Sequence, residues 1–144
     1  PNLPFTKQPE ARSLFEGKVK NFDETFGITT LAIGSENLYI TRELTEIGSL
    51  QRVMIKASDV GISKTPLPDK VSILNTPSAK IIKLEENGPY KVNVYLNIGH
   101  ENDGLMLLAR ITKKSSVDLN LQVGDTVYAL IKGVALNGQH NQLS

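Results

Sequence analysis

Short runs in which hydrophobic and polar residues alternate recur along the whole chain. Residues 18–20 (Lys-Val-Lys) and 38–41 (Leu-Tyr-Ile-Thr) alternate, and residues 28–33 (Ile-Thr-Thr-Leu-Ala-Ile) form a β-branched run. Short runs rich in β-branched and aromatic residues, bounded by Gly, Asn or Asp, are typical of strands. The pattern predicts strands at 18–20, 28–33, 38–41, 53–56, 79–82, 91–96, 105–111 and 126–131. Helical periodicity is nearly absent, and we expect at most one helical turn at 42–46 and another at 113–119.

The chain also repeats itself. Residues 17–19 match 79–81, Ile40-Thr41 matches Ile111-Thr112, and 53–57 match 129–133. Each unit would have about 60 to 65 residues, a size that buries little surface and gains from packing on a second unit or chain. Many short strands at regular spacing indicate an all-β fold, either a small barrel or a sandwich. We expect a lead-in segment at 1–14, a first unit at 15–63, a polar, proline-containing linker at 64–71, a second unit at 72–137 and a tail at 138–144.

Composition and charge narrow the function classes. The 144 residues include 16 Lys or Arg and 15 Asp or Glu, and the formal charge of +1 argues against a nucleic-acid partner. The absence of Cys excludes disulfides and thiolate zinc sites. No apolar run approaches the ~20 residues that cross a bilayer, so we expect no direct membrane insertion. The chain begins with Pro1 rather than Met, and we expect a piece of a longer protein.

No catalytic motif is visible. His100 and His140 lie in polar loops without partners at metal-ligand spacing, and the paired acidic residues fall at predicted turns. A glycine-rich phosphate loop and a nucleophile elbow are also absent from the sequence. We therefore expect a chain that is not an enzyme and that binds no bare metal cation.

The repeated polar residues suggest a binding site. Each unit has a Thr at a strand end (Thr41, Thr112) and a Lys at the end of its last strand (Lys56, Lys132), followed by small residues. A Lys beside exposed backbone N–H groups, with a hydroxyl nearby, suits a tetrahedral oxyanion. The alternative is that Thr simply favours strands and that Lys protects an edge strand. The residues themselves leave the two interpretations open.

Residues 52–63 (Arg-Val-Met-Ile-Lys-Ala-Ser-Asp-Val-Gly-Ile-Ser), followed by Ser-Ile-Leu-Asn at 72–75, resemble a known family. It is the C-terminal regulatory region of the molybdate-import ATP-binding proteins, a pair of Mop or TOBE-type domains. The resemblance extends from about residue 15 to about residue 136. It implies two tandem OB-like small β-barrels, assembled with further chains so that oxyanion sites form at interfaces.

The resemblance also implies the site residues. They belong to the segments that open the units, the strand-end Thr positions, a Ser downstream of Thr, and the Lys of the last strand with the residues after it. In this sequence they are Arg12, Thr41, Lys56, Ala57, Ser58, Ser72, Asn75, Thr112, Ser115, Lys132 and Gly133. The chain departs from the pattern at Glu10 and Leu44, where the family has Ser, and at Leu74, where it has Arg. Because Ser58 offers a hydroxyl that Gly133 lacks, we expect Lys56 to matter more than Lys132.

The implied function is an oxyanion-binding regulatory module, for molybdate or tungstate, of a molybdate ABC transporter ATPase subunit. No organic cofactor is implied, and the parent rather than this chain would hydrolyse ATP. The expected partners are a second copy of the chain in a dimer and, in the parent, a permease subunit. The parent would hold the chain in the cytoplasm at the inner membrane. A free-standing intracellular molybdate-binding protein is the main alternative, and a single-strand nucleic-acid binder of the OB type is a weaker one.

Overall fold

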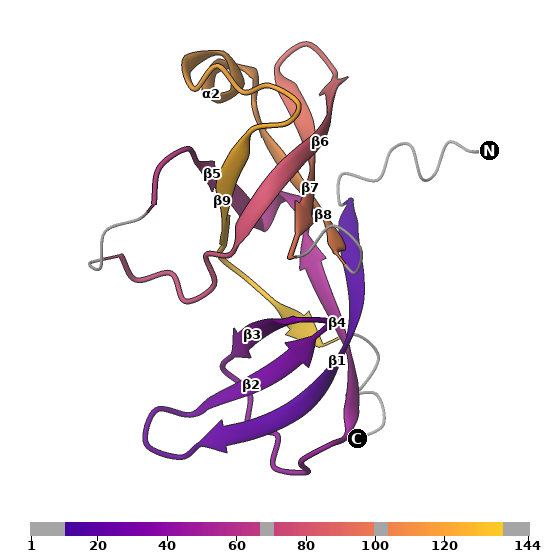
Figure 1. Ribbon diagram of the computed structural model, residues 1–144, viewed down its shortest axis with the longest axis vertical. Helices are drawn as coiled ribbons and strands as arrows, with labels where there is room; N and C mark the ends of the chain where they lie inside the picture. The colour runs from indigo at the N-terminus through magenta and orange to yellow at the C-terminus, as the bar shows by residue number, and fades with distance from the viewer. Residues whose placement is uncertain (1–10, 67–70, 100–103, 137–144) are drawn as a thin grey trace, which may run out of the picture.

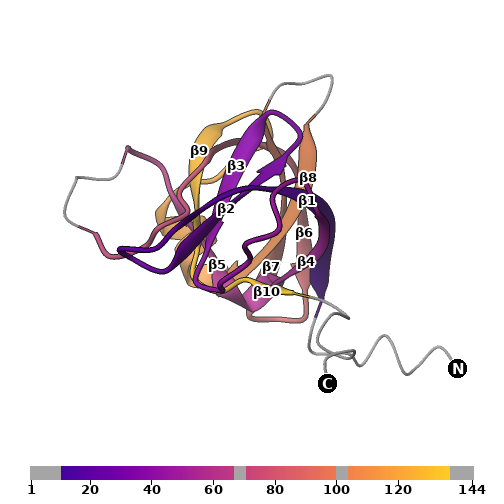
Figure 2. The ribbon, with the colours of Figure 1, turned by 90° about the horizontal axis from the view of Figure 1, so that it is seen from below.

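The structure, a computed structural model, describes residues 11–66, 71–99 and 104–136. These residues form two five-stranded antiparallel sheets, each curled into a small barrel, and the barrels follow one another along the long axis (Figure 1). Seen along that axis, the strands surround a common centre (Figure 2). The first sheet has the order β10(Ala135–Leu136)-β4(Leu50–Lys56)-β1(Arg12–Asp23)-β2(Ile28–Ile33)-β3(Glu36–Ile40). The second has the order β5(Val60–Ser63)-β9(Thr126–Ile131)-β6(Ser78–Asn87)-β7(Lys91–Ile98)-β8(Leu105–Thr112).

The all-β prediction is confirmed, and each predicted strand has its counterpart among β1–β4 and β6–β9. Alternation explains the core, because every second residue of a strand faces inward. Leu31 and Val53 in the first barrel, and Val94, Leu107 and Val127 in the second, are completely buried. The strands of both barrels and their buried residues therefore follow from local patterns in the sequence.

The repeat is visible in backbone detail. Both β1 and β6 have an irregularity in their pairing, after Val19 and after the matching Ile81. Each of these residues accepts a hydrogen bond of 2.8 Å from a glycine N–H, that of Gly48 or Gly124. The two glycines have φ values of +90° and +96°, a conformation that side chains with a Cβ rarely adopt. Bulges of this kind bend a strand, and here they curl both sheets at the same point of the repeat.

Two strands that the sequence pattern did not predict join the barrels. β5 follows β4 of the first sheet but pairs with β9 of the second. β10 follows β9 of the second sheet but pairs with β4 of the first. The expected unit boundaries at 63 and 72 stay a prediction about the sequence repeat, but strand pairing crosses them in both directions. Each sheet therefore needs one strand from the other half of the chain.

Of the two expected helical turns, one forms and the other does not. Residues 42–46 are not helical, because the buried Thr29 hydroxyl donates to the Arg42 carbonyl at 2.5 Å and accepts from the Leu44 N–H at 3.2 Å. A 3-10 turn, η1, forms instead at Ala57–Asp59. The second predicted turn is confirmed as α2, at Lys113–Asp118.

Candidate functional site

The segments that open the two units each hold an edge strand of the opposite barrel. Asn75 is only 7% exposed; its Oδ1 accepts from the Tyr39 N–H at 2.9 Å and its Nδ2 donates to the Tyr39 carbonyl at 2.8 Å. Ser13, which occupies the matching place in the first unit, accepts from the Leu108 N–H at 3.0 Å. Side chains with buried, satisfied hydrogen bonds fix local geometry firmly. The contact at Tyr39 holds the end of β3, and with it Thr41, against the start of the second unit.

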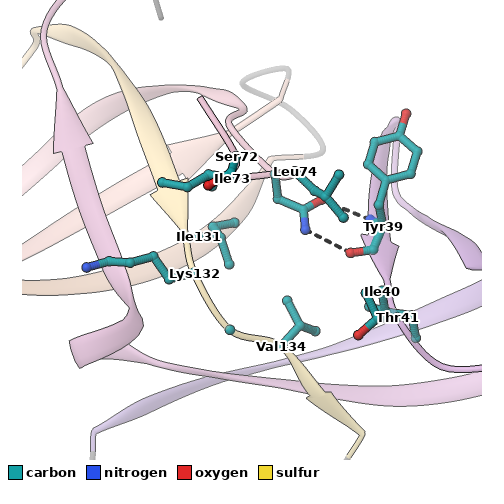
Figure 3. Close-up of a pocket in the computed structure, with 11 residues that line it drawn as sticks. Tyr39, Ile40, Thr41, Ser72, Ile73, Leu74, Ile131, Lys132 and Val134 are labelled. Carbon is teal, nitrogen blue, oxygen red and sulfur yellow. Dashed lines mark hydrogen bonds between the residues drawn. The ribbon is translucent and has the colours of Figure 1, made fainter. Parts of the chain in front are cut away.

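A cavity of about 470 Å³ lies at this seam between the barrels (Figure 3). Its walls come from the end of β3, from the segment before β6, and from the chain that runs from β9 to β10. The lining residues are Tyr39, Ile40, Thr41, Ser72, Ile73, Leu74, Asn75, Ile131, Lys132, Gly133 and Val134. Five residues predicted from the sequence thus meet in one cavity: Thr41, Ser72, Asn75, Lys132 and Gly133.

Lys132 sets the charge of the seam cavity. Among the described residues that line the cavity it is the single charged one, and none of these is acidic. Within the described parts of the chain, its ammonium makes no hydrogen bond or ion pair. Figure 3 shows the ammonium directed away from Thr41, and Lys132 also lines a neighbouring cavity of about 310 Å³ that contains Ser115. A lysine side chain has four flexible carbons, so its charge can be offered to either cavity.

The predicted residues around Lys56 are arranged differently. Arg12 lies opposite Lys56 across β1 and β4, and its Nη1 is 3.3 Å from the Met54 sulfur. The Ala57 N–H donates to the Ala11 carbonyl at 2.8 Å and is not offered to a ligand. Ser58 is exposed. Lys132 thus lines a cavity together with Thr41 and Ser72, whereas Lys56 does not, and the expected order of the two lysines stays a prediction.

Thr112 and Ser115 serve the start of α2. The Thr112 hydroxyl accepts from the Ser115 N–H at 3.0 Å and bonds to the Ser115 hydroxyl at the same distance. A Thr at this position satisfies one of the backbone donors that a helix leaves unpaired at its first turn. Their hydroxyls are thus already engaged, whereas Thr41 has no helix after it to cap.

Asp59 is a residue beside the site that sequence reasoning missed. Its carbonyl accepts from the Lys132 N–H at 2.7 Å. Its carboxylate lies against Gly133, where an added Cβ would be only 2.8 Å from Oδ2. A side chain at position 133 would therefore displace the Asp59 carboxylate. The repeat gave no signal for Asp59, because the matching position of the second unit is Ala135.

A second polar cluster covers the outer face of the second barrel, away from the cavity lining. Glu85 Oε1 accepts from the Tyr95 hydroxyl at 2.9 Å and from Asn93 Nδ2 at 3.4 Å, and Glu85 Oε2 is 3.7 Å from Lys83 Nζ. The hydrogen bond from Tyr95, followed by those from its neighbours, lowers the pKa of Glu85 below its ordinary value. The same bond, with partial burial, raises the pKa of Tyr95. Arg110 completes the cluster by donating to Asn93 at 2.9 Å.

The described residues contain neither a cluster of metal ligands nor a helix that could span a membrane. Within residues 11–66, 71–99 and 104–136, no three His, Asp or Glu side chains gather as metal ligands would. None of the helices in these ranges has the length and hydrophobicity to cross a membrane. His100 and His140 lie outside the described residues.

Comparisons with known proteins agree with this architecture. Residues 72–137 match the sequence profile of the TOBE domain. Over 95% of its length the chain is 33% identical to the molybdenum import ATP-binding protein ModC of Rhodobacter capsulatus, and covers 38% of that protein. It is 37% identical, over 94% of its length, to ModC of Rhodopseudomonas palustris strain CGA009, and covers 36% of it. The chain thus spans less than two fifths of these relatives.

A solved structure has the same fold. The molybdate-bound cytoplasmic molybdate-binding protein ModG superposes with a TM-score of 0.71 at 24% identity, over 88% of this chain and 95% of that one. The likeness supports two tandem OB-type barrels, as the strand pairing already indicates. Residues 72–137 form a TOBE domain, and over nearly its whole length the chain is homologous to molybdenum import ATP-binding proteins.

Proposed function

We propose that this chain is the oxyanion-sensing region of a molybdate transporter ATPase and that it binds molybdate or tungstate in the seam cavity. The observation that carries the proposal is the meeting of Thr41 from the first unit with Ser72 and Lys132 from the second around one cavity. The ligand class is supported by the relatives, which import molybdenum, and by the molybdate bound to the structural neighbour.

The residues fit a tetrahedral oxyanion chemically. An anion loses water contacts when it enters a cavity, and this cost must be offset by charge and hydrogen bonds. Lys132 supplies a positive charge, and Thr41 and Ser72 supply neutral hydroxyl donors from opposite walls. Hydrogen bonds between a cation and an anion are stronger than neutral ones. The lysine is therefore expected to carry most of the affinity.

The position of the cavity suits regulation. A ligand that contacts both units binds best when the two barrels adopt one relative arrangement, and so it favours that arrangement. In the proposed parent, this bias would restrain ATP hydrolysis when molybdate is plentiful. The chain itself would neither bind nor hydrolyse ATP, would use no organic cofactor, and would act in the cytoplasm as a dimer beside a membrane-embedded permease.

Calorimetric titration of the purified chain with molybdate, tungstate, sulfate and phosphate tests this function. We expect heat with molybdate and tungstate and little or none with sulfate. Lys132→Met keeps most of the apolar stem and removes the charge, so affinity should fall roughly 10- to 100-fold, since a charge-assisted bond contributes ~1.5 to 3 kcal/mol. Lys114→Met, on α2 with its ammonium 2.8 Å from Asp118, is the matched control and should bind normally. No heat with any anion would refute the proposal.

A free-standing molybdate-binding protein is the second candidate, because the chain covers 95% of ModG but only 38% of the first ModC relative. The two candidates differ in the size of the natural protein. An antibody raised against this chain should detect a band well above 15.8 kDa in cell extract if the chain is part of a transporter ATPase. A single band near 15.8 kDa would favour the free-standing protein instead.

A further inference from the structure

A smaller cavity, of about 230 Å³, lies where the exchanged strand β10 meets β4. Its lining residues are Met54, Lys56, Asp59, Gly133, Val134 and Ala135. It adjoins the seam cavity, because Gly133 and Val134 line both. Because Lys56 matches Lys132 in the repeat, each of the two repeated lysines lines a cavity, and this one is the Lys56 cavity.

The two cavities differ in charge. Within the part of the chain that the structure describes, the seam cavity is lined by Lys132 and by no acidic residue, whereas the Lys56 cavity is lined by both Lys56 and Asp59. The Asp59 carboxylate packs against Gly133 at this wall, where its Oδ2 would be 2.8 Å from an added Cβ. Like charges repel strongly in a partly desolvated site, so an oxyanion entering the Lys56 cavity would meet no net attraction.

The hydrogen-bond donors near Lys56 point to the same conclusion. The Ala57 N–H is bonded to the Ala11 carbonyl, and neither Arg12 nor Ser58 is among the described residues that line the cavity. A backbone donor that is already paired gains little by turning to a ligand. Among the described residues, the Lys56 cavity thus has a carboxylate beside its lysine, whereas the seam cavity has a lysine with two hydroxyls and no carboxylate.

We propose that Asp59 determines how many oxyanions the chain binds: it keeps the Lys56 cavity empty of anion and leaves the seam cavity to bind one per chain. This inference rests on the proposed function, because it concerns the same ligand. It assigns Asp59 a role in specificity that its position in the η1 turn alone would not suggest.

The test is the stoichiometry of tungstate binding, measured by calorimetry. The wild-type chain should bind one tungstate per chain, and Asp59→Asn should add a second, weaker event. Adding Lys56→Met to Asp59→Asn should abolish that second event, whereas adding Lys132→Met should remove the first. Asn has nearly the size of Asp, so the packing against Gly133 is kept, and the thermal midpoint without ligand reports whether the variant folds.

Each result has a clear meaning. No binding by the wild-type chain would refute the proposed function itself. Two events in the wild-type chain, or one event in folded Asp59→Asn, would refute the role of Asp59 while leaving the function intact. If Asp59→Asn does not fold, Lys56→Met in the otherwise wild-type chain decides. Unchanged affinity and stoichiometry would support the inference, and a loss of tungstate binding would overturn it.

Discussion

Asn75 offers the sharpest structural prediction, because one side chain joins the two barrels beside the seam cavity. Its amide makes two hydrogen bonds with the backbone of Tyr39, at 2.9 and 2.8 Å, and is 7% exposed. Asn75→Ala removes both bonds and releases the end of β3 from the second unit. The change should lower both the free energy of unfolding and the affinity for tungstate.

The magnitude follows from the two lost bonds. A neutral hydrogen bond contributes ~0.5 to 1.5 kcal/mol net, so Asn75→Ala should cost about 1 to 3 kcal/mol. Affinity should fall at least about tenfold, or ~1.4 kcal/mol, because Thr41 is no longer held in place for the ligand.

Urea unfolding and calorimetric titration with tungstate measure the two effects. Asn37→Ala is the matched control: Asn37 lies on β3, the strand that Asn75 holds through Tyr39, and its side chain is exposed. Within the described residues it accepts a hydrogen bond only from Lys20 Nζ, at 3.3 Å. Its stability should stay within ~0.5 kcal/mol of the wild-type chain, like most surface substitutions. The reasoning fails if Asn75→Ala matches Asn37→Ala in both stability and affinity.

Three further predictions concern charge, capping and pH. Leu74→Arg adds a second cation to the seam cavity wall and should raise molybdate affinity roughly tenfold at low salt, an advantage that high salt reduces; unchanged affinity would show that charge does not limit binding. Thr112→Ala removes the hydrogen bond from the Ser115 N–H and should lower the free energy of unfolding in urea by about 1 kcal/mol, with tungstate affinity unchanged. Weaker tungstate binding would show instead that Thr112 contributes to the site. In the folded chain, the hydrogen bond from Tyr95 lowers the pKa of Glu85 below its ordinary value of 4.5. The ionised Glu85 carboxylate therefore stabilises the folded chain above about pH 4.5, and this stabilisation is lost as the pH falls below that value. Glu85→Gln should therefore flatten the stability profile below about pH 4.5, and a profile that falls as in the wild-type chain would contradict the argument.

The strands could be predicted because their signal is local. Alternation in 91–96, for example, places Val92, Val94 and Leu96 on one buried face whatever the strand pairs with. The exchanged strands could not be predicted in the same way. Gly61 interrupts the apolar run of β5, and β10 has only two residues, so neither stretch shows a period. Both are strands because of their distant partners β9 and β4, and local patterns contain no information about such partners.

The sequence indicated which residue types belong to the candidate site, but not which of these residues meet in one cavity. Repetition singled out Thr41, Lys56 and Lys132 as residue types suited to an anion. That Thr41 meets Lys132 rather than the lysine of its own unit depends on the exchange of strands and on the Asn75 contact. The turn expected at 42–46 does not form for a related reason: the buried Thr29 hydroxyl, thirteen residues before Arg42 in the chain, bonds to the backbone of this segment.

The most direct test of the central claim is to locate the ligand. Crystals of the chain grown with tungstate can be measured on both sides of a tungsten absorption edge, and the anomalous difference map then marks the metal of the oxyanion. The account predicts a peak in the seam cavity, between Thr41, Ser72 and Lys132. A peak beside Lys56 alone, or no peak in crystals that hold the chain folded and saturated with tungstate, would contradict it.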